Sequence, residues 1–129
     1  MPKRELPRPT DAELEILKVL WRRGPSTVRE VFDALSGTRG TGYTTVLKLM
    51  QIMAEKRLVV RDEKERAHRY EAALEEGETQ SRLVGDLLRK AFDGSARKLV
   101  LHALSTERAS AEELAEIRSM LDELERKKR

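Results

Sequence analysis

Five polar or charged side chains share one face of the segment from Tyr43 to Lys56, whose apolar spacing predicts a helix. They are Thr44, Thr45, Lys48, Gln51 and Glu55. Hydroxyl and ammonium groups suit phosphate oxygens, and a glutamine amide can pair with the edge of an adenine. This face therefore predicts contact with the groove and backbone of DNA. The alternative is an ordinary solvated helix face.

Two more residues of this helix leave alternatives open. Leu47 lies on the polar face, where it could contact a thymine methyl group or pack locally. Tyr43 could reach a phosphate through its hydroxyl or could only staple the start of the helix. The other side of the helix has the i, i+3, i+4, i+7 spacing of a buried face, formed by Val46, Leu49, Met50 and Met53.

Two capping boxes predict two helices ahead of this one. Thr10 and Glu13 open the first, which stops at Gly24-Pro25 because proline cannot continue a helix. We expect it to bury Leu14, Leu17, Leu20 and Trp21. Thr27 and Glu30 open the second, which ends at Ser36-Gly37 with Val28, Val31, Phe32 and Leu35 inward. A glycine-rich loop, 37–42, then leads to the third helix.

A β-hairpin is predicted after the third helix, with strands at 58–61 and 67–72 and a polar turn at 62–66. Three helices followed by a hairpin is the order of a winged helix, in which the second helix of the helix-turn-helix lies in the major groove. Four cations of the hairpin could touch the DNA backbone as a wing, or could protect an edge strand from aggregation: Arg61, Lys64, Arg66 and Arg69.

The C-terminal part is helical and apolar on one side. An acidic hinge, 74–78, precedes predicted helices at 79–92 and 96–104 and a last helix that follows a capping box at Ser110 and ends in 126–129. A segment this short rarely buries enough apolar surface to form a core by itself. We therefore expect a second copy of the chain to complete the core. The expected dimer contacts are Leu83, Leu87, Leu99, Leu114, Ile117, Leu121 and Leu124. The predicted fold is thus mainly α with a small β-hairpin wing, namely a winged helix-turn-helix domain (1–73) followed by a helical dimerisation domain (74–129).

Composition agrees with a DNA-binding role and excludes several others. The net charge is +3, but residues 1–70 have 15 Lys and Arg against 10 Asp and Glu, so the positive excess is N-terminal. The chain has no cysteine, no long apolar run and a polar N-terminus, so we expect a cytoplasmic protein without membrane insertion. His68 and His102 lack nearby ligands, so no metal or other cofactor is expected, and no catalytic arrangement is visible.

Three segments in order resemble the penicillinase-repressor family of the BlaI/MecI type: "TDAELEILKVLWRRGPSTVREVFDAL", "GYTTVLKLMQIMAEKRLV" and "SAEELAEIRSMLDEL". The likeness runs from about Leu6 to Leu124. It implies a winged-helix DNA-binding domain, a helical dimerisation domain and repression through a palindromic operator. Related copper-responsive repressors have a C-terminal cysteine cluster, which this chain lacks.

The resemblance also implies a way to release the repressor. The best-known members are cut in the dimerisation domain by a membrane sensor-protease pathway, between Asn and Phe, and the matching pair here is His102 and Ala103. The matching segment is 98–104, in which we expect Leu99, Val100 and Leu104 to be buried. A rival hypothesis for the whole chain is a protein-interaction adaptor with a winged-helix fold and no DNA role.

Overall fold

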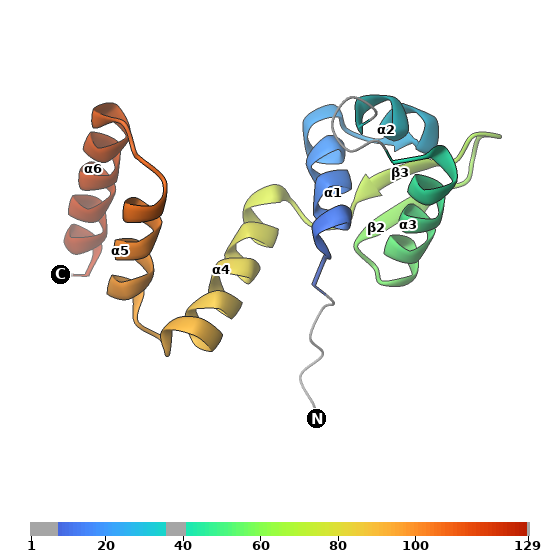
Figure 1. The fold of residues 1–129 in the computed structure, drawn as a ribbon. Helices are drawn as coiled ribbons and strands as arrows, with labels where there is room; N and C mark the ends of the chain where they lie inside the picture. Colours follow the sequence, from blue (N-terminus) through green and yellow to red (C-terminus); the bar gives the residue numbers. More distant parts are fainter. Residues whose placement is uncertain (1–7, 36–40, 129) are drawn as a thin grey trace. The chain divides into compact units, whose positions relative to one another are not determined.

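The computed structural model describes residues 8–35 and 41–128 as helices, short strands and their connections (Figure 1). The N-terminal elements are α1 (Asp11–Arg23), β1 (Ser26–Thr27), α2 (Val28–Leu35), α3 (Tyr43–Glu55), β2 (Val59–Asp62) and β3 (Arg69–Ala72). The C-terminal helices are α4 (Glu76–Phe92), α5 (Ala96–Thr106) and α6 (Ala111–Lys127). The predicted end of the second helix and most of the glycine-rich loop lie outside the described residues.

The order of the N-terminal elements confirms the winged helix. The hairpin of β2 and β3 follows α3, with Arg61 opposite Tyr70 in the antiparallel register. The sequence did not predict β1, a strand of two residues that pairs with β3 and places Ser26 opposite Tyr70. The sheet order is therefore β1-β3-β2, which leaves β2 at one edge beside α3.

Two of the three predicted capping boxes formed in full, whereas at the start of α6 the structure has only the bond from the Glu113 N–H to the Ser110 hydroxyl. The Glu13 N–H donates to the Thr10 hydroxyl over 3.2 Å, and the Thr10 N–H donates to the Glu13 carboxylate over 2.9 Å. The same reciprocal pair joins Thr27 and Glu30 at the start of α2. Helix α1 ends at Gly24, whose N–H bonds the Leu20 carbonyl at a φ of 87°, a conformation that favours glycine.

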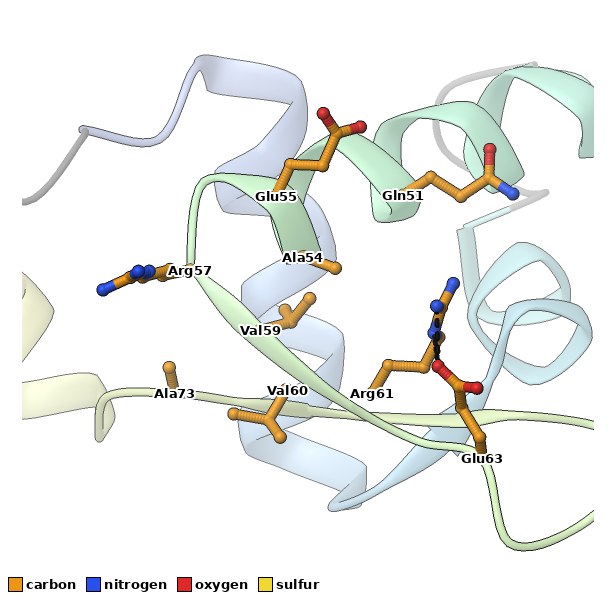
Figure 2. Close-up of a pocket in the computed structure, with 9 residues that line it drawn as sticks. All are labelled: Gln51, Ala54, Glu55, Arg57, Val59, Val60, Arg61, Glu63 and Ala73. Carbon is orange, nitrogen blue, oxygen red and sulfur yellow. Dashed lines mark hydrogen bonds and ion pairs between the residues drawn. The ribbon is translucent and has the colours of Figure 1, made fainter.

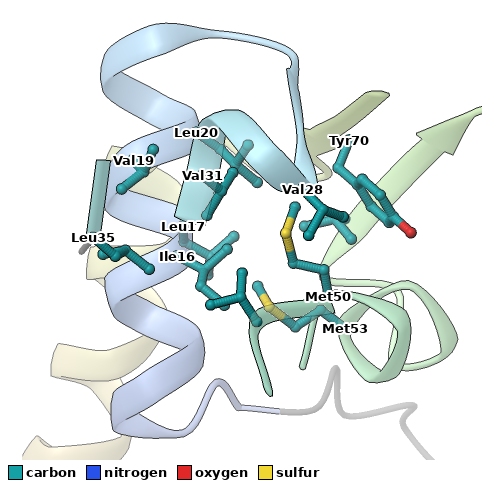
Figure 3. Close-up of a cluster of buried hydrophobic side chains, with 12 residues drawn as sticks. Ile16, Leu17, Val19, Leu20, Val28, Val31, Leu35, Met50, Met53 and Tyr70 are labelled. Carbon is teal, nitrogen blue, oxygen red and sulfur yellow. The ribbon is translucent and has the colours of Figure 1, made fainter. Parts of the chain in front are cut away.

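One apolar core joins α1, α2, α3 and the sheet (Figure 3). Helix α1 contributes Ile16, Leu17, Val19 and Leu20 to this core. Of the four α1 side chains expected to be buried, Leu17 and Leu20 are buried, whereas Leu14 and Trp21 are only partly buried. The face of α1 that meets the core is rotated from the predicted one. Trp21 instead lies at the margin of the core and donates its indole N–H to the Leu74 carbonyl over 2.9 Å.

A buried ion pair ties the start of α1 to the end of α3. The Glu13 side chain is 3% exposed, and its carboxylate accepts a 2.6 Å bond from the Lys56 ammonium, which is 26% exposed. Glu13 thus has a second role besides capping. Lys56 is the C-cap of α3, so the pair fixes where α3 ends relative to α1. The chain then turns sharply at Arg57, which has a φ of 66°.

The C-terminal helices bury very little by themselves. Helix α4 begins at Glu76, so part of the predicted acidic hinge is its first turn, where carboxylates favour the positive end of the helix dipole. Neither α5 nor α6 has a buried residue. The compact N-terminal unit extends to Leu83 and the second unit starts at Val84. Within the described residues, no helix combines the length and apolar character needed to cross a bilayer.

Candidate nucleic-acid interface

The polar face predicted for α3 is exposed in the structure. Thr44, Thr45, Lys48 and Gln51 all lie on the solvent side of the helix. The first turn of α3 has no acidic residue, and Lys48 has no acidic partner among the described residues. Val46, Met50 and Met53 anchor the opposite side in the core. From its first turn to Gln51 this face is uncharged or cationic, which suits a polyanion, and Glu55 in the last turn is its one exposed carboxylate.

The structure bears on the alternatives left open for two residues of α3. Leu47 is partly buried and packs against the core, which is the local packing considered for it. The ring of Tyr43 meets the ring of Phe32 edge to face, with centroids 5.8 Å apart, so Tyr43 does staple the start of α3 to α2. The Tyr43 hydroxyl can still donate a hydrogen bond to a phosphate, because the residue is exposed. Sequence reasoning missed Ile52, which is also exposed on this helix.

A cation next to this aromatic pair was not predicted. Arg29 of α2 places its guanidinium carbon 5.6 Å from the Phe32 ring centre and 5.8 Å from that of Tyr43. The sequence signal was available in part, because Arg29 and Phe32 are three residues apart on one helix. The contact between Arg29 and the Tyr43 ring, in contrast, forms only when α3 packs against α2. The three side chains form one cluster at the start of α3.

A groove of about 740 Å³ lies between the second half of α3 and the edge strand β2 (Figure 2). Gln51 and Glu55 line it from α3, and Arg61 and Glu63 line it from the other side. The carboxylate of Glu63 holds the Arg61 guanidinium at 2.6 Å. The groove joins the exposed face of α3 to the hairpin, so a single ligand can touch both.

The four cations of the hairpin differ in how far they are already engaged. The Tyr70 hydroxyl and then the Glu63 carboxylate raise the pKa of Arg61. Arg69 pairs with Glu30 at 3.3 Å and with Glu65 at 3.6 Å. Lys64 and Arg66 are exposed and have no ion pair with any described residue. These last two are the hairpin cations best placed to meet a phosphate.

The pKa of Glu30, the partner of Arg69, lies below its ordinary value. The hydrogen bond from the Thr27 N–H is the main cause that lowers the pKa of Glu30, and the charges of Arg69 and Arg23 act in the same direction, whereas burial opposes them. Arg69 therefore helps to join β3 to the start of α2. A phosphate contact by Arg69 has to compete with this carboxylate.

The residues predicted for dimerisation lie on α4, α5 and α6. Leu83, Leu99, Leu114 and Ile117 are partly buried, whereas Leu87, Leu121 and Leu124 are about half exposed or more. Further exposed apolar side chains accompany them: Val84, Val100, Leu101, Leu104 and Met120. Apolar surface of this extent on a soluble helix usually marks an interaction site.

The segment predicted for cleavage lies within α5. His102 and Ala103 are exposed, and the His102 ring lies 5.7 Å from that of Phe92. In the single chain Val100 and Leu104 are exposed and Leu99 is only partly covered, so burial of this segment would require a second copy. Residues 8–35 and 41–128 hold no cluster of three or more potential metal ligands.

Known proteins identify the family. The penicillinase repressor family profile matches residues 9–123. The chain belongs to the penicillinase-repressor family. The transcriptional regulator BlaI of Mycobacterium tuberculosis is 38% identical over 122 residues, which cover 94% of this chain and 88% of that protein. The penicillinase repressor of Bacillus licheniformis is 25% identical, with 98% of each chain covered. These relatives are named as regulators and not as enzymes, in agreement with the expectation from the sequence.

Two solved structures in this family match the N-terminal part. The DNA-binding domain of the repressor BlaI matches with a TM-score of 0.52 and 25% identity, over 59% of this chain and 93% of that one. The B. licheniformis BlaI monomeric form in complex with the blaP half-operator matches with a TM-score of 0.50 and 26% identity, over 57% and 90%. Both matches agree with the winged-helix assignment.

Proposed function

We propose that this protein is a homodimeric transcriptional repressor that binds a palindromic DNA operator through α3 and the hairpin wing, in the cytoplasm. Residues 1–73 bind DNA and residues 74–129 dimerise. The exposed polar face of α3 carries the proposal, because it stands on a winged helix similar to one solved with a half-operator. Thr44, Thr45, Lys48 and Gln51 face the DNA, with Tyr43 at the start of α3 and Lys64 and Arg66 on the wing.

The four cations of the hairpin have different roles in this proposal. Lys64 and Arg66 contact the backbone, because they have no ion pair within the described residues. Arg61 faces the groove beside Gln51 and can turn from Glu63 to a phosphate. Arg69 supports the wing through its ion pair with Glu30 of α2. Leu47 serves mainly to pack α3 onto the core.

The adaptor hypothesis is less well supported. An adaptor surface on α3 should present a contiguous apolar or acidic patch. The exposed side of α3 instead has two threonines, a lysine and a glutamine, and its one carboxylate, Glu55, is isolated in the last turn. Ile52 adds one exposed apolar side chain to this polar face, which is too little for a contiguous apolar patch. Such a face favours DNA over a protein partner.

Dimerisation through the C-terminal helices rests on surface that one chain leaves uncovered. Leu87, Leu121 and Leu124 have about half or more of their surface exposed, and α5 and α6 have no buried residue. A second copy covers this surface and completes a core that one chain cannot form. Two linked DNA-binding units then match a two-fold symmetric operator.

Replacing Lys48 with alanine should weaken DNA binding in a way that depends on salt. Each phosphate contact releases counterions, so loss of one contact should lower the slope of log affinity against log salt by about 1 per subunit. The probe is a duplex that the wild-type protein selects from a random-sequence pool. Affinity is measured by fluorescence anisotropy over a series of salt concentrations.

Lys18→Ala is the matched control for Lys48→Ala. Lys18 is an exposed cation of α1 that pairs with Glu15 at 3.1 Å, so its removal changes the net charge equally. The control should keep the wild-type slope. Wild-type binding that does not vary with salt would refute the proposed DNA-binding function. Equal slopes for Lys48→Ala and the control would remove Lys48 from the interface.

We further propose that repression is lifted by a cut within residues 98–104, under the control of a membrane sensor-protease system. The exposed position of His102 and Ala103 on α5 supports this site, although α5 must unfold locally to enter a protease. A cut here detaches α6 and its share of the dimer surface. Mass spectrometry of the protein should find the two fragments in de-repressed cells and the intact chain in repressed cells. Full-length protein in fully de-repressed cells would contradict cleavage.

A further inference from the structure

We propose that Arg29 is an additional anchor for the DNA backbone, held ready by the rings of Phe32 and Tyr43, an assignment that rests on the DNA-binding function proposed above. Arg29 lies on α2, outside the face of α3 and outside the hairpin wing. Its ligand is a phosphate of the strand that runs past the start of α3. The contact reads no base, so it fixes position and not sequence.

The ring contacts give Arg29 a defined orientation. Its guanidinium carbon is 5.6 Å from one ring centre and 5.8 Å from the other, within the reach of about 6 Å for a cation–π interaction. The two rings are nearly perpendicular, at 78°, so together they limit the guanidinium on two sides. A guanidinium over a ring keeps its in-plane N–H donors for another acceptor.

The rest of the side chain is open to a ligand. The side chain is 68% exposed, and its acidic neighbour is Asp33, with 3.9 Å between Nε and the carboxylate. An exposed pair of this length, one turn apart on a helix, contributes little to stability. A phosphate can therefore take the guanidinium from Asp33 at small cost. Arg69 differs, because Glu30 holds its guanidinium at 3.3 Å and Glu65 pairs with it as well.

The position of the cluster places Arg29 at the DNA strand. In a helix-turn-helix the first helix crosses the backbone while the second enters the groove by its first residues. Here α2 is the first of these helices. Tyr43, which touches Arg29, is the first residue of α3 and is followed by the exposed Thr44 and Thr45. Arg29 thus lies where a backbone that passes α2 meets the start of α3.

Arg29→Gln tests this contact through the salt dependence of binding to the selected duplex. One lost phosphate contact should lower the log–log slope by about 0.9 per subunit, and affinity at fixed low salt should fall roughly tenfold per half-site. Lys18→Gln is the control, because Lys18 is also an exposed helix cation paired with a carboxylate one turn away. It should retain the wild-type slope and affinity.

The slope separates a DNA contact from a structural role. If Arg29 only joins α2 to α3, Arg29→Gln weakens binding or lowers thermal stability but keeps the wild-type slope, and the proposal is overturned. If the wild-type protein shows no salt-dependent DNA binding, the proposed function fails, and this result is independent of the Arg29→Gln variant. The two failures are therefore distinguishable.

Phe32→Leu tests the part of the rings. Leucine keeps an apolar side chain against the core but removes one of the two faces that hold Arg29. The substitution should weaken binding about threefold in the wild type and much less in the Arg29→Gln background, because the two residues act together. Equal losses in both backgrounds, with folding intact by circular dichroism, would overturn the role of the rings.

Discussion

Leu121→Asp should convert the proposed dimer into a monomer and lower operator affinity by on the order of 100-fold or more. Leu121 lies on α6 in the row with Ile117 and Leu124, and it is 53% exposed in the single chain. A carboxylate without a partner in a dry interface costs several kcal/mol, and the symmetric dimer contains two of them. Loss of the dimer removes the benefit of engaging both half-sites at once. Sedimentation at micromolar concentration and a DNA titration provide the two measurements.

Ser119→Asp is the matched control on the same helix. Ser119 is exposed and lies about 200° around α6 from both Ile117 and Leu121, so the same charge is added away from the apolar row. This variant should remain dimeric and should bind DNA nearly as the wild type does. A Leu121→Asp protein that stays dimeric with unchanged strength would show that α6 does not form the interface.

Glu13→Ala should lower the free energy of unfolding of the N-terminal unit by about 2–4 kcal/mol. The substitution leaves the Lys56 ammonium partly buried without its partner, and the Thr10 N–H loses its acceptor. It also removes a side chain that is only 3% exposed, so a small cavity remains. Hydrogen exchange of the core amides of Val31 and Met50 measures this loss, because such amides exchange through the opening of the whole unit.

Glu15→Ala provides the comparison on the same helix. Glu15 is partly exposed and pairs with the exposed Lys18, so its loss should cost less than about 1 kcal/mol. The combined change Glu13→Gln and Lys56→Met should recover part of the stability lost by Glu13→Ala, because both charges leave the interior together. Equal destabilisation by Glu13→Ala and Glu15→Ala would mean that the pair with Lys56 contributes nothing.

The parts of the fold that depend on nearby residues could be predicted from the sequence. Thr10, Thr27 and Gly24 mark helix ends through bonds that span a few residues, and these ends were found where expected. The strand β1 was missed because two residues have no strand signal of their own and depend on β3 for pairing. The rotation of α1 toward the core was also missed, since the helix pattern admits neighbouring faces and only packing selects one.

The residues of the candidate site likewise include some that the sequence predicted and some that it did not. The exposed face of α3 followed from helical spacing, so Thr44 and Lys48 were identified directly. The burial of Glu13 was not predictable, because its cation partner is 43 residues away. Arg29 was overlooked for a related reason, since the second ring that holds it belongs to another helix. Contacts that join distant parts of the chain require the fold before they can be identified.

The bond from Trp21 to the Leu74 carbonyl gives the protein a natural optical reporter. Trp21 is the single tryptophan of the chain, so all indole emission comes from one place at the margin of the N-terminal core. The indole N–H is tied over 2.9 Å to the segment that leads into α4. Release of that segment exposes the indole to water and shifts its fluorescence to longer wavelength. The emission spectrum therefore reports the attachment of this connection to the winged helix, while α5 and α6 contribute no tryptophan signal of their own.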